Sequence, residues 1–288
     1  MTRKPIFVLL VFLSILALAS LACGIRVPVK RIQAGTTQTE KIDIPAPDVS
    51  GAAELSIVFG AGELTLDPGA ENALVSGEAT YNVEELKPEV QVNGKDVTLS
   101  QGQENGGFST MEGNVRNEWD LQLGAMPFKL DIKAGAYDGR YELGGLSLEK
   151  LTVQDGAANV KMSFSEPNQA EMSLLRYETG ASDVTLKGLA NANFAEMEFR
   201  SGAGDYTLDF TGDFQRDAEV TVESGISSVT IIVPEGMNVE LNFDGGLSNV
   251  DTSGEWQQKG SRYVQVGEGP TLNITVKMGA GNLKLENP

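Results

Sequence analysis

Histidine is absent from this 288-residue sequence, and cysteine occurs once, at Cys23. Without histidine the chain lacks the side chain most used for proton transfer near neutral pH and for binding zinc or copper. A single cysteine excludes an internal disulfide, a paired-cysteine redox motif and a thiolate-held iron–sulfur cluster. Gly-x-Ser-x-Gly elbows and phosphate-binding loops are also missing, and the usual hydrolytic triads need a histidine. The composition therefore predicts a protein that is not an enzyme and that has no cofactor and no catalytic or metal-binding residues.

Basic residues are scarce as well: 22 Lys and Arg stand against 40 Asp and Glu, which gives a formal charge of −18. Nucleic acids and anionic lipid surfaces are bound mainly through clusters of Lys and Arg. The charge balance therefore argues against nucleic acid as a partner. Solubility is the simplest explanation of the acidic excess.

The first 22 residues predict a signal peptide. Arg3 and Lys4 precede an apolar run of 17 residues, 6–22, and small residues follow near its end. This order of basic, apolar and small residues is typical of exported precursors. The segment Ala19-Ser20-Leu21-Ala22-Cys23-Gly24 resembles a bacterial lipobox. The resemblance implies that Cys23 receives a diacylglycerol through its sulfur and becomes the N-terminus after cleavage.

An uncleaved anchor helix with a buried cysteine is the alternative for this segment. In both cases the remainder of the chain lies outside the cytoplasm. With lipid on Cys23 the membrane is a partner, and the protein is held on the outer cell surface or in an outer membrane, depending on the host. Residues 23–49 contain three prolines and show no helical or strand period, so we expect a tether there.

A repeat of about 22 residues dominates the sequence after residue 130. Successive glycines at 135, 156, 180, 202, 225 and 246 are 21, 24, 22, 23 and 21 residues apart, and the last step, to Gly279, is 33. Each glycine is the first residue of a short motif such as Gly180-Ala181-Ser182-Asp183-Val184 or Gly202-Ala203-Gly204-Asp205-Tyr206. A fixed spacing over this many units is typical of a repeat architecture.

Apolar and polar residues alternate on both sides of each motif, as in Ala195-Glu196-Met197-Glu198-Phe199. This period predicts strands with one buried face, joined by a corner at which glycine would adopt a positive φ and Asn or Asp would bond its own backbone. The sequence thus predicts an all-β fold, either a β-solenoid in which each repeat stacks on the preceding one or a β-sandwich meander. The solenoid explains better why like residues recur at like positions. Residues 251–269, with Trp256, would then be an insertion in the last step.

The less regular section 50–143 contains Ala53-Glu54-Leu55-Ser56-Ile57 and Gly60-Ala61-Gly62-Glu63-Leu64, with expected strands at 74–81, 90–92 and 97–99 and a loop at 101–113. These two motifs and the sequence that follows them, as far as Glu85-Leu86-Lys87-Pro88-Glu89-Val90, resemble the bacterial toast-rack N-terminal domain. The repeats at 144–288 are similar to adhesin-like proteins and to the C-terminal domain of cell-wall-active antibiotic response proteins. The resemblance implies a solenoid-like exported module without known catalytic residues.

Two groups of side chains are candidates for binding. In a solenoid, acidic residues at equivalent positions would lie in neighbouring strands and would repel each other. Bound calcium would relieve this repulsion. The acidic residues concerned are Glu171, Glu196, Glu198, Glu219, Glu223 and Glu240. Solvated carboxylates are the simpler explanation. Four aromatic residues would either stack on sugar rings or anchor the core; they are Phe108, Trp119, Trp256 and Tyr263.

These observations favour a non-enzymatic, lipid-anchored surface protein that binds a glycan, another polymer or a protein through its β face, in the manner of an adhesin. The first alternative is an envelope-stress or regulatory module that acts with a membrane partner. The second is a polysaccharide-active β-helix enzyme that uses paired carboxylates, such as Glu196 and Glu219.

Overall fold

The computed structural model describes residues 30–48, 51–102 and 109–287, and this part of the chain is almost entirely β-structure. Two 3-10 turns, Glu84–Leu86 and Leu189–Ala192, interrupt the strands. None of the described residues belongs to a helix with the length and hydropathy needed to cross a membrane. The strands are β1 (Lys30–Gln33), β2 (Gln38–Pro45), β3 (Ala53–Ala70), β4 (Ala73–Tyr81), β5 (Pro88–Asn93), β6 (Asp96–Gln101), β7 (Ser109–Glu112), β8 (Asn117–Gly124), β9 (Phe128–Glu142), β10 (Leu148–Ser163), β11 (Met172–Lys187), β12 (Phe194–Asp209), β13 (Ala218–Ile232), β14 (Met237–Ser253), β15 (Gln257–Lys259), β16 (Arg262–Gln265) and β17 (Glu268–Glu286).

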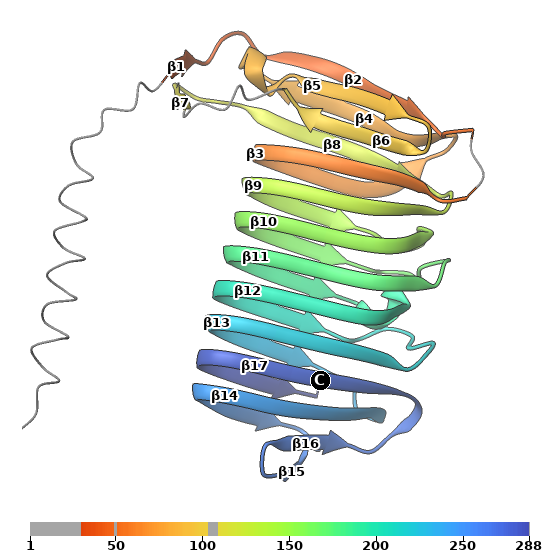
Figure 1. Ribbon diagram of the computed structural model, residues 1–288, viewed down its shortest axis with the longest axis vertical. Helices are drawn as coiled ribbons and strands as arrows, with labels where there is room; N and C mark the ends of the chain where they lie inside the picture. Colours follow the sequence, from red (N-terminus) through yellow and green to blue (C-terminus); the bar gives the residue numbers. More distant parts are fainter. Residues whose placement is uncertain (1–29, 49–50, 103–108, 288) are drawn as a thin grey trace, which may run out of the picture.

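Long parallel strands, stacked in the order β3-β9-β10-β11-β12-β13-β17-β14, form the body of the molecule. Each long strand bends once, at its repeat glycine, so that its two halves lie opposite each other (Figure 1). We call the half before the glycine the first arm and the half after it the second arm. Neighbouring long strands are about 4.8 Å apart, the usual spacing of a β-sheet. The structure therefore confirms the solenoid and excludes the meander.

The repeat glycines stack directly on one another at the bend. A Cβ atom on Gly180 would lie 2.4 Å from the carbonyl oxygen of Gly156, and Gly202 stands in the same relation to Gly180. Close approach of the backbones therefore requires these glycines. The expectation that they adopt a positive φ is wrong; the positive values occur two residues later, at Gly62, Gly204 and Gly281.

The core lies between the two arms. Inward side chains form apolar columns, one residue from each long strand, and the register of neighbouring strands aligns them. One first-arm column contains Leu55, Leu130, Leu151, Leu175, Met197, Val220, Ile274 and Leu241, all of them buried. Period-two alternation in each repeat therefore becomes a continuous core along the stack.

The last two long strands do not stack in sequence order. The expectation that each repeat stacks on the preceding one is wrong here, because β17 lies between β13 and β14. Residues 251–269 include the end of β14 and a hairpin, β15–β16, whose strand β16 pairs with the first arm of β14. The inward residues of β17 are large and apolar, whereas Thr252 of β14 is exposed. The more apolar strand thus takes the position with neighbours on both sides.

The N-terminal end of the stack is built differently from the repeats. The second arm of β3 pairs with β8, and β4 and β2 follow it in antiparallel pairing; the first arm of β3 pairs with β6, which pairs with β5. Residues 38–45, inside the segment expected to be a tether, are strand β2. Residues 109–112, inside the expected loop, are strand β7 and pair with β1. The stack continues through residue 143 without interruption, because β9 pairs with β10 along their length.

Candidate binding surface

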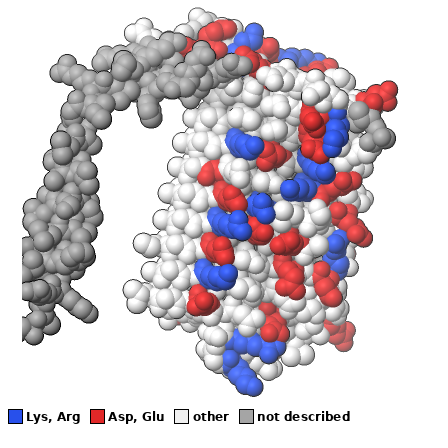
Figure 2. All heavy atoms as spheres, viewed as in Figure 1, with Lys and Arg blue, Asp and Glu red and all other residues white. Residues whose placement is uncertain are grey.

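Charged side chains form columns on the outer face of the first arms. The register places one column, in spatial order, at Lys133, Gln154, Glu178, Arg200, Glu223, Lys277 and Asp244. From Glu178 onward, acidic and basic residues alternate from strand to strand. Figure 2 shows acidic and basic side chains interleaved over one face of the molecule. We call this column the charged ladder.

The charged ladder is joined by hydrogen bonds and ion pairs. Arg200 Nη1 lies 3.1 Å from Glu178 Oε1, and its Nε lies 3.5 Å from Glu223 Oε2. Lys277 Nζ lies 3.0 Å from Glu223 Oε1. The Lys277 ammonium, with help from Arg200, holds the pKa of the Glu223 carboxyl below its usual range. Pairs this exposed contribute about 0.2–1 kcal/mol each to stability, so their main effect is to orient the side chains.

A second charged column runs beside the charged ladder and is linked to it. Arg176 Nε donates to Glu198 Oε2 at 2.9 Å, and Arg200 Nη2 lies 3.1 Å from the same carboxylate oxygen. Arg200 therefore contacts carboxylates in both columns. The two columns are therefore joined at Glu198, and charges of both signs lie side by side on β11 and β12.

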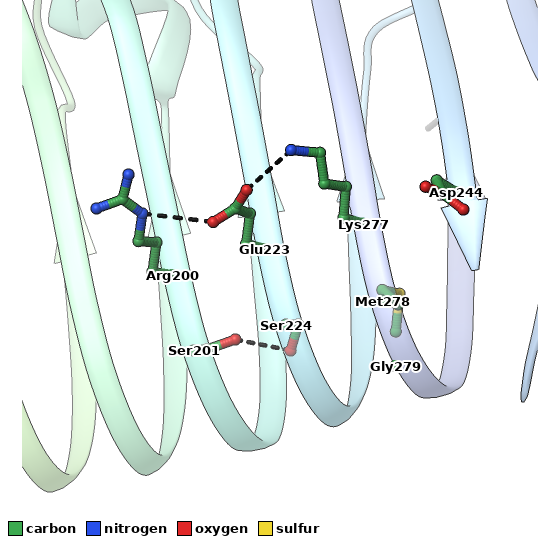
Figure 3. A pocket seen from close by; sticks show the side chains of 8 residues that line it. All are labelled: Arg200, Ser201, Glu223, Ser224, Asp244, Lys277, Met278 and Gly279. Atoms are coloured by element: carbon green, nitrogen blue, oxygen red, sulfur yellow. Dashed lines mark hydrogen bonds and ion pairs between the residues drawn. The ribbon is translucent and has the colours of Figure 1, made fainter. Parts of the chain in front are cut away.

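A shallow depression of about 480 Å³ lies on β12, β13, β17 and β14, next to the bend. Arg200, Glu223, Lys277 and Asp244 line one side of it; Ser201, Ser224, Met278 and Gly279 complete the lining. Figure 3 shows Glu223 between Arg200 and Lys277, with the Ser201 and Ser224 hydroxyls hydrogen-bonded to each other nearby. The depression thus presents cations and carboxylates together, a combination that can hydrogen-bond a polar chain, whereas the Ser201 and Ser224 hydroxyls occupy inward positions and bond each other.

Glu196 and Glu219 lie opposite each other on β12 and β13, as predicted, whereas other acidic residues of the predicted repelling column have partners. Glu171 pairs with Arg216 at 3.1 Å, Glu219 accepts from the Asn273 amide at 2.9 Å, and Glu240 pairs with Arg262. Glu240 is not next to Glu219, because β17 lies between their strands. In the described parts of the chain, no three carboxylates come together in a way that could hold a metal ion. Ion pairs therefore reduce the repulsion at Glu171 and Glu240, while calcium binding at the acidic face stays a prediction.

Two of the four aromatic candidates are core residues. Trp119 is 1% exposed and Tyr263 is 4% exposed, so neither ring is available to stack on a sugar. Trp256 is partly buried and packs against the core. Phe108 and Cys23 lie outside the described residues.

The Asn and Asp residues of the repeat motifs form an exposed column on the second arms. The register aligns Asp138, Asn159, Asp183, Asp205, Ser228, Asn282 and Asn249. Asn249 donates to the side chains of Asp251 and Asn282 and not to its own backbone. For this residue the expected backbone bond is wrong.

Sequence reasoning missed a polar cluster inside the bend. The Asp155 carboxylate accepts from the Tyr177 hydroxyl at 2.7 Å and from the Thr179 hydroxyl, and Tyr141 donates to Tyr137 at 2.9 Å. Burial, followed by the nearby Tyr137 and Asp155, raises the pKa of Tyr177 well above its usual value. Asp155 precedes its repeat glycine at a position occupied elsewhere by Thr179, Ser201 and Ser224. This run of polar residues at an inward position was the available signal.

Solved structures with similarity to the chain come from several bacteria. A "putative cell adhesion protein" from Clostridium sporogenes ATCC 15579 has 19% identity and a TM-score of 0.46, covering 88% of this chain and 100% of that one. A "putative lipid binding protein" from Parabacteroides distasonis ATCC 8503 has 10% identity and a TM-score of 0.43, with 89% and 100% coverage. A "putative adhesin" from Bacteroides fragilis NCTC 9343 has 11% identity and a TM-score of 0.34, with 88% and 100% coverage.

No curated protein matches the chain. The family described as "N-terminal domain of toast_rack, DUF2154" matches residues 33–174 and again 168–232. The two matches together span well over half of the sequence and extend from the end of β1 to the end of β13. The bent, evenly stacked strands and this match agree, and the chain belongs to the toast-rack N-terminal domain family.

Proposed function

We propose that this protein is a non-enzymatic, lipid-anchored cell-surface protein that binds an extracellular polymer or protein along the outer face of its first arms. The charged ladder supports this proposal, because it presents alternating charges at the fixed spacing of the strands. A ligand with a regular repeat can contact such an array at several places at once, and multiple weak contacts add up to strong attachment. The shallow depression beside Lys277 suits the side of a long chain better than an enclosed small molecule.

Membrane attachment through Cys23 is the second part of the proposal. An acyl chain contributes about 0.8 kcal/mol per buried methylene, so two or three chains hold a protein firmly on a membrane. Anchoring at the N-terminal end would leave the body of the stack free to reach a ligand. The anchor is tested by mass spectrometry of the mature N-terminus and by detergent partitioning of a Cys23→Ser variant. An unmodified thiol on an intact precursor contradicts it.

Ligand binding is tested with the full chain in detergent on arrays of immobilised glycans and matrix proteins. The double variant Arg200→Glu with Lys277→Glu should weaken binding at least tenfold, because it removes both cations around Glu223. Lys161→Glu with Lys284→Glu makes the same charge change on exposed second-arm positions and should leave binding unchanged. Equal losses in the two variants would show that net charge alone acts. Release of reducing sugar from any bound glycan would contradict the non-enzymatic assignment.

A further inference from the structure

The two arms of β14, the last strand of the stack, differ in what covers them. Residues 239–242 of the first arm pair with β16, and Phe243 N donates to Ser261 O at 2.9 Å just beyond. The second arm, residues 247–253, pairs with β17 on one side. Among the residues that the structure describes, no strand pairs with its other side. In Figure 1 the β15–β16 hairpin lies under one arm of β14 only.

Inward positions on this second arm are open to solvent. Val250 is only partly buried and Thr252 is exposed, although the residues at these positions in β12, β13 and β17 are all buried. Leu247, on the outer side of the bend, is 86% exposed, and the equivalent Ile226 of the interior strand β13 is 71% exposed, so this exposure follows from the outward position. Repeat proteins need a cap on each terminal unit, and here one half of the terminal unit lacks it.

The chemistry of a free strand edge specifies its ligand. Every second residue along such an edge directs an N–H and a C=O outward, and another extended backbone satisfies this pattern. Glycans and metal ions do not match both the donors and the acceptors at this spacing. The open inward positions add a requirement for apolar side chains at alternate positions of the added strand.

The opposite end of the same sheet shows how an edge is protected. Strand β2 has Glu40, Lys41, Asp43 and Pro45 within eight residues, and charges and proline are typical protections against pairing. The second arm of β14, residues 247–253, contains a single charge, Asp251, and no proline. A second copy stacked end to end would have to present the protected β2 edge. The β15–β16 hairpin also blocks a bent strand from lying across both arms, whereas a single strand fits beside it.

We propose that the second arm of β14 accepts one extended peptide segment of a protein partner as an additional strand. The segment carries apolar residues opposite Val250 and Thr252 and a basic residue opposite Asp251. This chain already contains such a segment, because residues 279–286 of β17 pair with the other edge of the same arm and place Lys284 opposite Asp251. The site is on the second arms, away from the charged ladder, and does not rest on the proposed function.

The test uses a capped synthetic peptide with the sequence of residues 279–286, Gly-Ala-Gly-Asn-Leu-Lys-Leu-Glu. The peptide should bind the full chain saturably and should slow amide exchange at residues 247–253. The same peptide with N-methyl groups at alternate residues should not bind, because the backbone donors are removed. Absence of saturable binding, or protection elsewhere, overturns the proposal.

Two variants locate the site on the protein. Val250→Lys and Leu247→Lys place a charge at the free edge and should each weaken peptide binding at least tenfold. Leu247→Lys tolerates the change best because its side chain is almost fully exposed. Thr207→Lys, on the outer face of the second arm of β12, is the matched control and should bind normally. Unchanged peptide binding in both edge variants would overturn the proposal. A full chain that sediments as an oligomer, and that Leu247→Lys converts to a monomer, would also overturn it and would assign the edge to a second copy.

Discussion

The interior strands of the stack and its terminal strand β14 have similar sequences but different burial. At one inward second-arm position, Tyr141, Met162, Leu186, Leu208, Ile231 and Leu285 are buried, whereas Thr252 of β14 is exposed. On the first arm, where β16 covers β14, Leu241 is buried like its equivalents. Burial in this fold therefore depends on having a neighbour on each side, and alternation within one strand is not sufficient.

The largest expected effect compares one inward position in the two settings. Leu208→Ala should lower the free energy of unfolding by about 2–5 kcal/mol, because a fully buried side chain leaves a cavity. Thr252→Ala, at the equivalent position on β14, should change it by less than about 0.5 kcal/mol. Urea unfolding followed by far-UV circular dichroism measures both. Similar losses in the two variants would mean that the terminal arm is covered in solution.

A smaller loss is expected where two backbones meet at the bend. A Cβ atom on Gly204 would lie 1.8 Å from the carbonyl oxygen of Ser182, and its φ is +148°. Gly204→Ala should therefore cost about 3 kcal/mol through both overpacking and backbone strain. Gly236→Ala is the control, since its φ is +79° and nothing lies within 4 Å of the added atom; it should cost about 1–2 kcal/mol. Equal melting temperatures for the two variants would show that the close approach has no energetic consequence.

The smallest effect is a pH dependence to which the buried tyrosines of the interior bends contribute. Because burial raises the pKa of Tyr177 in the folded state, the neutral phenol stabilises the fold, and this stability is lost as pH rises above about 10. The free energy of unfolding should fall by up to about 1.4 kcal/mol per pH unit for each such tyrosine. Tyr177→Phe should reduce the dependence of the free energy of unfolding on pH between pH 9 and 11. Strand β14 has Phe243 at the equivalent position, and this residue contributes nothing to the dependence. An unchanged slope would locate the ionising groups elsewhere.

Much of the repeat region could be predicted from the glycine spacing and the alternation around it. For example, Asp183 and Asp205 have the same place in their repeat motifs and are paired in the structure, as the repeat implies. The stacking order of β17 could not be predicted, because spacing defines what a repeat contains and not which repeat it pairs with. Strand β2 was missed because it pairs with β4, about 30 residues or more along the chain, and its eight residues include three charges and a proline.

The candidate surface was harder to predict than the fold. Glu219 and Glu240 were identified as acidic neighbours, yet their compensation by Asn273 and Arg262 depends on strands that lie far apart in sequence. Trp119, by contrast, could have been assigned to the core, because it alternates with Asp120 and Gln122 in the same pattern as Leu121 and Leu123. The members of the charged ladder all lie two residues before their repeat glycines, so the sequence aligns them, but the alternation of charge also depends on β17 lying between β13 and β14.

The position of β17 has a consequence for the making of the protein. Strand β17 is synthesised after β14 but lies between β13 and β14, so these two strands acquire their final neighbours only after β17 has been made. A nascent or truncated chain that ends before residue 268 would leave two unsatisfied sheet edges facing each other. Synthesis of β17 is thus a condition for closing the stack, and a product that lacks this strand should be recognisable to proteases as an open one.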